Sequence, residues 1–159
     1  MGSATSASGR FIVVGFDGSP SSDAALRWVL GVAAQPGDAV HAVVVRPTET
    51  PVPGTSPAFQ APGRRPAGQY SPHAHIAGIR AEFAAASEVT ISTPHGDPAT
   101  ELITASTDAD LLVVGAHGAG RTREFLLGSV SRECVRYSRC PVVVVTPEAA
   151  RRLVPAPTA

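Results

Sequence analysis

The sequence contains no lysine, because all 13 of its basic residues are arginine. Walker-type phosphate loops, Schiff-base enzymes and receiver domains each depend on a lysine, so the usual form of each is excluded. Cysteine is scarce as well: Cys134 and Cys140 form neither a disulfide framework nor a CxxC pair. We interpret both as small buried hydrophobic residues.

Long apolar runs are also absent. No run approaches the roughly 20 residues that span a bilayer, and residues 1–10 lack the apolar core of a signal peptide. The 13 basic and 13 acidic residues balance, which leaves no electrostatic basis for binding nucleic acid or a membrane surface. These absences predict a cytoplasmic protein without nucleic-acid or membrane partners.

Short apolar segments alternate with helical patterns along the chain. Strands are expected at 11–16, 39–45, 89–92, 111–114 and 142–145, and helices at 20–34, 73–86, from 98 onward and at 130–137. This alternation predicts βαβ units and a parallel sheet in an α/β fold. We expect a single domain over 11–147, with a disordered leader (1–10), a mobile loop rich in proline and glycine (48–72) and a flexible tail (148–159).

A glycine-rich stretch lies between the fourth strand and the last helix. It comprises Gly115, Ala116, His117, Gly118, Ala119, Gly120 and Arg121, followed by Gly128, Ser129, Val130 and Ser131. Backbone N–H groups and a helix N-terminus can converge on an anion at such a point, and glycine lets the backbone approach it. Ser129 and Ser131 would add hydroxyl donors. The stretch predicts a phosphate site, although glycines alone equally fit a long turn.

The spacing of these residues is more specific than their composition. Gly115, Gly118 and Gly128-Ser129 reproduce a G-x2-G-x9-G-[ST] pattern that resembles the ATP-binding branch of the universal stress protein family. The segments 13–19, 95–99, 110–115 and 139–145 also resemble landmarks of that family, in the same order. The resemblance covers most of residues 11–147.

The resemblance implies a three-layer, doubly wound α/β sandwich of the Rossmann-like, adenine nucleotide alpha hydrolase-like kind. Its five parallel strands would have the order 3-2-1-4-5, so the topological switch lies between strands 1 and 4, where such folds bind ligands. The carboxyl ends of those strands are residues 17–19 and 115–121. The resemblance also implies a homodimer through the last strand, whose exposed edge would otherwise favour aggregation; that strand comprises Val142, Val143, Val144 and Val145.

The family's ATP site can be carried over to matching positions. Asp17 would contact adenine or ribose beside Gly15, Gly18 and Ser19, and Val44 or Val45 would form part of the adenine wall. Gly115, Gly118 and Gly120 would approach the ribose and phosphates, with Mg²⁺ bridged through the phosphates. Ser129 and Val130 would donate N–H groups, and Arg121 would supply charge. Considered without the resemblance, Asp17 could equally serve only to form the turn, and His117 could be an exposed loop residue.

Signs of a dedicated enzyme are missing. There is no G-x-S-x-G elbow and no metal-ligand spacing among the five histidines, of which His73 and His75 are expected to be solvated. We therefore expect a nucleotide-dependent regulatory switch with an unidentified protein partner and at most slow ATP hydrolysis. A cyclic-AMP-binding protein and a ligand-free dimeric adaptor are the alternatives. A flavin carrier is disfavoured, because Trp28 and Tyr137 fall on helices.

Overall fold

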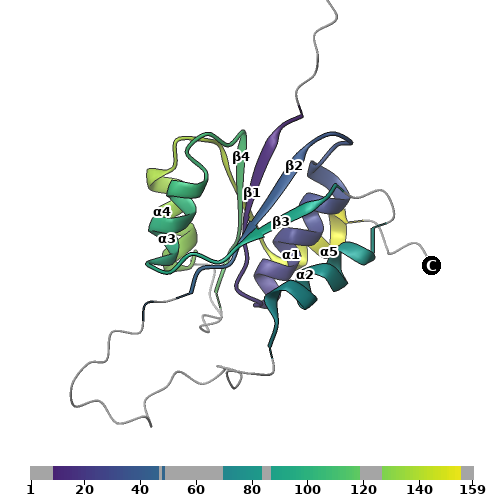
Figure 1. Cartoon of the computed structure of the whole chain (residues 1–159), viewed down its shortest axis with the longest axis horizontal. Coiled ribbons are helices and arrows are strands. Elements are labelled where there is room, and N and C mark those ends of the chain that lie inside the picture. The colour runs from purple at the N-terminus through teal and green to yellow at the C-terminus, as the bar shows by residue number, and fades with distance from the viewer. Residues whose placement is uncertain (1–8, 47, 49–69, 84–86, 119–126, 155–159) are drawn as a thin grey trace, which may run out of the picture.

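A computed structural model describes residues 9–46, 48, 70–83, 87–118 and 127–154 (Figure 1). Five strands alternate with helices along this part of the chain. The strands are β1 (Phe11–Gly15), β2 (Ala39–Val43), β3 (Val89–Ser92), β4 (Leu111–Gly115) and β5 (Val142–Val145). The helices are α1 (Pro20–Trp28), η1 (Val29–Ala33), α2 (Pro72–Ala81), α3 (Pro98–Ala105), α4 (Ser129–Tyr137) and α5 (Pro147–Leu153).

The five strands form one parallel sheet with the order β3-β2-β1-β4-β5. This confirms the predicted topology and places the switch between β1 and β4. These two strands carry apolar residues on both faces, as central parallel strands do. Their central residues are almost fully buried: Ile12, Val13, Val14, Leu112, Val113 and Val114 are at most 3% exposed.

Two helical layers cover the sheet. Figure 1 shows α1, α2 and α5 on one face and α3 and α4 on the other. Because side chains alternate along a strand, Val14 joins Leu26 and Ile76 in the first core, while Val13 joins Leu102 and Cys134 in the second. Within the described ranges, no helix is long and apolar enough to cross a bilayer.

Four of the five α-helices begin with a side-chain cap followed by proline. Ser19, Ser71, Asp97 and Thr146 each accept a hydrogen bond from the N–H group three residues further on. The caps at Ser19 and Asp97 were expected from the sequence, because both residues precede a proline that suits the first helical position. In the described part of the chain, α4 alone starts without such a cap, at Gly128.

Several element ends differ from the sequence-based expectation. The helix expected over 20–34 changes after Trp28 into a π-helical turn, closed by a 2.8 Å bond from the Ala34 N–H to the Val29 carbonyl. Strand β2 ends at Val43 rather than at residue 45. Helix α2 starts one residue early and ends at Ala81; residues 84–86 lie outside the described residues.

Both ends of the domain are more structured than expected. Residues 147–153 form α5 instead of a flexible tail, because Thr146 caps the helix and Ala150 packs into the core beside α1. At the other end, Arg10 is held by three hydrogen bonds to Asp38, one from its backbone N–H at 2.8 Å and two from its side chain at 3.1 and 2.6 Å, rather than lying in a free leader. The rest of the predicted leader, loop and tail (1–8, 49–69 and 155–159) lies outside the described residues.

Candidate functional site

A cavity of about 410 Å³ opens at the carboxyl ends of β1, β2 and β4, at the topological switch. This volume is in the range of small-molecule sites. Most of the predicted site residues that the structure describes line it. The lining comprises Gly15, Phe16, Asp17, Val43, Val45, Pro98, Leu102, Val114, Gly115, His117, Gly118, Gly128, Ser129, Val130 and Ser131.

The turn after β1 supplies the carboxylate of the cavity. The Ser19 N–H donates to Asp17 Oδ1 at 2.9 Å, and the Asp17 N–H donates to Ser22 Oγ at 3.3 Å. Gly18 has a φ of +76°, a conformation that favours glycine. Asp17 Oδ2 faces the opposite wall, 3.2 Å from where a Cβ on Gly118 would lie. Asp17 is therefore both a turn former and a cavity residue.

Three of the site residues predicted after β1 and β2, namely Gly18, Ser19 and Val44, do not line the cavity. Ser19 is 4% exposed and serves as the cap of α1. Val44 is buried in the first core, on the other face of the sheet, whereas Val45 lines the cavity. The alternation of side chains along an extended chain thus shows that Val45, and not Val44, can form part of the adenine wall.

An apolar wall faces the cavity and was largely missed by sequence reasoning. It contains Phe16, Val43, Pro98, Leu102 and Val114 besides Val45. Strand alternation could have indicated Val43, which points to the same side as Val45. Pro98 and Leu102 come from α3, whose position over the sheet has no local sequence signal.

Gly115 and Gly118 differ in what surrounds them. A Cβ on Gly115 would lie 2.6 Å from the Ser21 carbonyl carbon, so this glycine lets α1 approach β4 closely. Among the described residues, a Cβ on Gly118 would meet only Asp17 Oδ2. Gly118 is therefore the motif glycine whose missing side chain leaves space in the cavity, and Gly115 is needed for packing.

The N-terminus of α4 borders the same cavity. Ala116 is buried, and its carbonyl accepts from the Gly128 N–H at 2.8 Å and from Ser131 Oγ at 3.1 Å, which joins the loop to the helix. The Ser131 hydroxyl is thus engaged within the protein rather than offered to a ligand. With no side-chain cap at Gly128, the first N–H groups of α4, including those of Ser129 and Val130, face an open site.

His117 lines the cavity between the carboxylate and the helix. Its Nδ1 atom is buried and has no hydrogen-bond partner among the described residues. Ala119, Gly120 and Arg121, which the sequence also assigned to the site, lie outside the described residues. The described residues contain no group of three or more His, Cys, Asp and Glu side chains arranged to hold a metal ion.

Two further reactive side chains, Cys134 and His75, do not line the cavity. Cys134 is fully buried, and burial raises the pKa of its thiol to about 11, as expected for a packing residue. His75 is not the solvated residue expected from the sequence: it is half-buried and bonded to Tyr70 and Asp23. The cavity itself combines an apolar wall, one carboxylate and exposed N–H donors, which suits a ligand with an apolar ring and an anionic end.

Comparison with known proteins gives a consistent result. Residues 10–146 match the universal stress protein family. Universal stress protein Rv2623 of Mycobacterium tuberculosis is 35% identical over 148 residues, covering 86% of this chain and 48% of the relative. Universal stress protein Rv2005c of the same organism is 34% identical over 142 residues, covering 84% and 47%. The chain therefore spans about half the length of these curated relatives.

Solved structures show the same fold. A universal stress protein crystallised in complex with cAMP has 26% identity and a TM-score of 0.59, with 87% of this chain and 97% of that chain covered. The hypothetical protein MJ0577 has 19% identity and a TM-score of 0.64, with 87% and 96% covered.

Proposed function

The chain belongs to the universal stress protein family, and from this premise we propose that its cavity binds an adenine nucleotide, with ATP as the principal ligand. One observation carries the proposal: the cavity joins an apolar wall to the uncapped N-terminus of α4. Gly118, Gly128 and Ser129 of the G-x2-G-x9-G-[ST] pattern all lie on it. An apolar wall suits a purine ring, and a helix N-terminus suits a phosphate.

Each part of the nucleotide has a matching surface. The adenine ring would lie against Val45 and Leu102, and Asp17 Oδ2 would accept a hydrogen bond from the base or the ribose. The N–H groups of Ser129 and Val130 would donate to phosphate oxygens, with Arg121 as a further source of charge. Ala119 and Gly120 complete this loop in the proposal, and Mg²⁺ would be held through the phosphates.

We propose a regulatory role rather than a dedicated enzymatic one. Among the described lining residues, no hydroxyl is hydrogen-bonded to a histidine or a carboxylate, which is the arrangement that activates a nucleophile. ATP would act as a signal in the cytoplasm. Its binding would order residues 116–128 and part of 48–72, and the ordered loops would present a surface to a protein partner. Turnover should stay far below the roughly 10 s⁻¹ of typical enzymes.

Cyclic AMP is the second candidate ligand. The structural neighbour with 26% identity is a complex with cAMP. A cyclic monophosphate would use the same apolar wall and Asp17, but it has no β- and γ-phosphates to place at the glycine loop. The number of phosphates that the cavity prefers therefore distinguishes the two candidates.

Calorimetric titration with ATP, AMP, cAMP and GTP tests the proposal. We expect ATP to bind most tightly, and Gly118→Val to weaken it at least tenfold, since the added side chain would occupy cavity space beside Asp17. Gly78→Val is the matched control, because a Cβ at Gly78 on α2 meets no atom of the described part of the chain within 4 Å. Tighter binding of cAMP would favour the second candidate. Unchanged affinity in a folded Gly118→Val protein would refute the assignment of the glycine loop.

Hydrogen exchange tests the regulatory part. Saturating Mg-ATP should slow amide exchange in residues 116–128, because bound phosphates would restrain the loop that joins β4 to α4. Unchanged exchange there, in a protein that binds ATP, would contradict the switch.

A further inference from the structure

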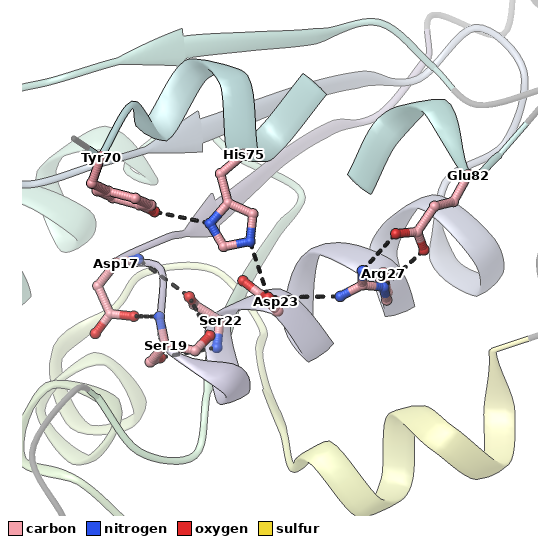
Figure 2. Close-up of polar contacts among 8 residues, drawn as sticks. All are labelled: Asp17, Ser19, Ser22, Asp23, Arg27, Tyr70, His75 and Glu82. Carbon is pink, nitrogen blue, oxygen red and sulfur yellow. Dashed lines mark hydrogen bonds and ion pairs between the residues drawn. The ribbon is translucent and has the colours of Figure 1, made fainter. Parts of the chain in front are cut away.

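A chain of polar contacts runs beside the Asp17–Gly18–Ser19 turn and links α1 to α2 (Figure 2). The Tyr70 hydroxyl lies 3.1 Å from His75 Nδ1, and His75 Nε2 lies 3.1 Å from Asp23 Oδ2. Asp23 in turn lies 3.8 Å from Arg27, which forms a two-bond pair with Glu82 at 2.6 and 2.9 Å. Residues far apart in the sequence are thus joined between α1 and α2.

The direction of these hydrogen bonds follows from the acceptor at one end. An ionised Asp23 carboxylate only accepts, so His75 Nε2 carries the proton and donates to it. In the neutral ring, His75 Nδ1 is then an acceptor, and the Tyr70 hydroxyl donates to it. Asp23 thereby sets the tautomer of His75 and orients the Tyr70 hydroxyl.

Two contacts connect this chain to the cavity. The Tyr70 hydroxyl occupies the space beside Gly18, where an added Cβ would overlap it. The His75 ring packs edge-on against Phe16, with centroids 5.2 Å apart and an interplanar angle of 80°. Phe16 lines the cavity. Gly18 directly follows Asp17, and the Asp17 carboxylate faces the cavity.

We propose that Tyr70, His75 and Asp23 form a polar clamp that holds the Asp17–Gly18–Ser19 turn in its ligand-binding position. Tyr70 and His75 are positioning residues: they act on the ligand through Gly18 and Phe16. The predicted effect on the conformation of the turn does not depend on the proposed function, whereas the predicted effect on nucleotide affinity rests on it.

The same three residues also have the order of an activated hydroxyl nucleophile, in which a carboxylate orients a histidine that takes a proton. The geometry favours the clamp, because the Tyr70 hydroxyl lies between Gly18 and His75 instead of facing the cavity. A covalent adduct on Tyr70 after incubation with Mg-ATP, detected by intact mass and peptide mapping, would overturn the clamp.

Hydrogen exchange of the nucleotide-free protein tests the clamp directly. Tyr70→Phe should speed amide exchange of residues 17–19 by about threefold to tenfold, the effect expected from loss of the hydrogen bond between the Tyr70 hydroxyl and His75. Exchange of residues 112–114 in the sheet core should not change. His73→Ala is the control: His73 is exposed and lies on α2 close to Tyr70 in the sequence, and its replacement should leave both segments unchanged. Equal exchange of residues 17–19 in wild type and Tyr70→Phe would overturn the proposal.

A second pair of variants separates positioning from general destabilisation. His75→Gln retains one donor and one acceptor and should preserve slow exchange in residues 17–19, whereas His75→Leu should not. Mg-ATP affinity should follow the same order, with Tyr70→Phe and His75→Leu weakened about threefold to tenfold. If wild type binds no adenine nucleotide, the proposed function fails and the exchange data still decide the clamp. If His75→Leu equals His75→Gln in exchange, the clamp is refuted.

Discussion

Replacing Gly115 with alanine tests why the glycine motif contains that residue. Gly115 ends β4, and its missing side chain faces α1. An added Cβ would lie 2.6 Å from the Ser21 carbonyl carbon and 2.7 Å from both the Ser21 Cβ and carbonyl oxygen. These atoms belong to the backbone or are directly attached to it, so no rotamer change relieves the overlap. The helix or the strand has to move.

The expected cost can be estimated from two opposing effects. Overpacking a close-packed interior costs about 1–3 kcal/mol, while replacing glycine within a strand returns about 0.5–1 kcal/mol of backbone entropy. We therefore expect Gly115→Ala to lower the free energy of unfolding by about 1 kcal/mol, and by at most about 2.5 kcal/mol. Gly118→Ala should change it by no more than about 0.5 kcal/mol, since among the described residues its Cβ would meet only the end of the Asp17 side chain, and its φ is not positive.

Urea denaturation followed by circular dichroism measures both variants against wild type. Gly78→Ala is the control: it lies on an exposed helical face, and we expect a gain of up to about 1 kcal/mol from helix propensity alone. If Gly115→Ala and Gly118→Ala have equal stability, the close approach of α1 to β4 does not explain Gly115, and the distinction between the two motif glycines fails.

Three further predictions concern other parts of the fold. Burial raises the pKa of Cys134 to about 11, so this thiol should resist iodoacetamide at pH 8 in the folded protein, while half-buried Cys140 should react. Peptide mass mapping measures both reactions, and equal labelling would contradict the burial of Cys134 in the core. Arg27 lowers the pKa of Glu82 below the usual 4.5, so the pair stabilises the fold above that pH, and this contribution is lost as pH falls through the folded value. Glu82→Gln should therefore reduce stability at pH 7 in urea titrations, and the reduction should shrink as the pH is lowered below 4.5; a reduction that does not change with pH would contradict the pairing. The carbonyls of Pro141 and Val145 accept hydrogen bonds from Leu112 and Ala116 on the β4 side, so the N–H group of Val144 points away from β4. If two chains pair along β5, Val144→Pro should therefore shift the dimer toward monomer in light scattering while the fold is retained. A monomeric wild type would refute the dimer.

Much of the fold is encoded in local patterns. The apolar runs at β1 and β4 and the Ser19-Pro20 and Asp97-Pro98 helix starts predicted elements that the structure confirms within a few residues. The same logic was available at Thr146-Pro147, where a cap and a proline begin α5. That helix was missed because its apolar residues are few, and Ala150 becomes a core residue only where α1 lies beside it.

The sequence by itself determined the order of the elements and a parallel α/β sheet, because strand and helix periodicity are local properties. The strand order and the place of the cavity at the switch between β1 and β4 were expected from the family resemblance, which rests on the spacing of the glycines and the order of the matching segments. Tertiary structure decided which residues face that cavity. It selected Val45 over Val44, added Pro98 and Leu102 from α3, and turned Gly115 into a packing residue against Ser21. It also brought Tyr70 and His75 against Gly18 and Phe16. Such contacts depend on how the helices are placed over the sheet, and no single segment of the chain encodes that placement.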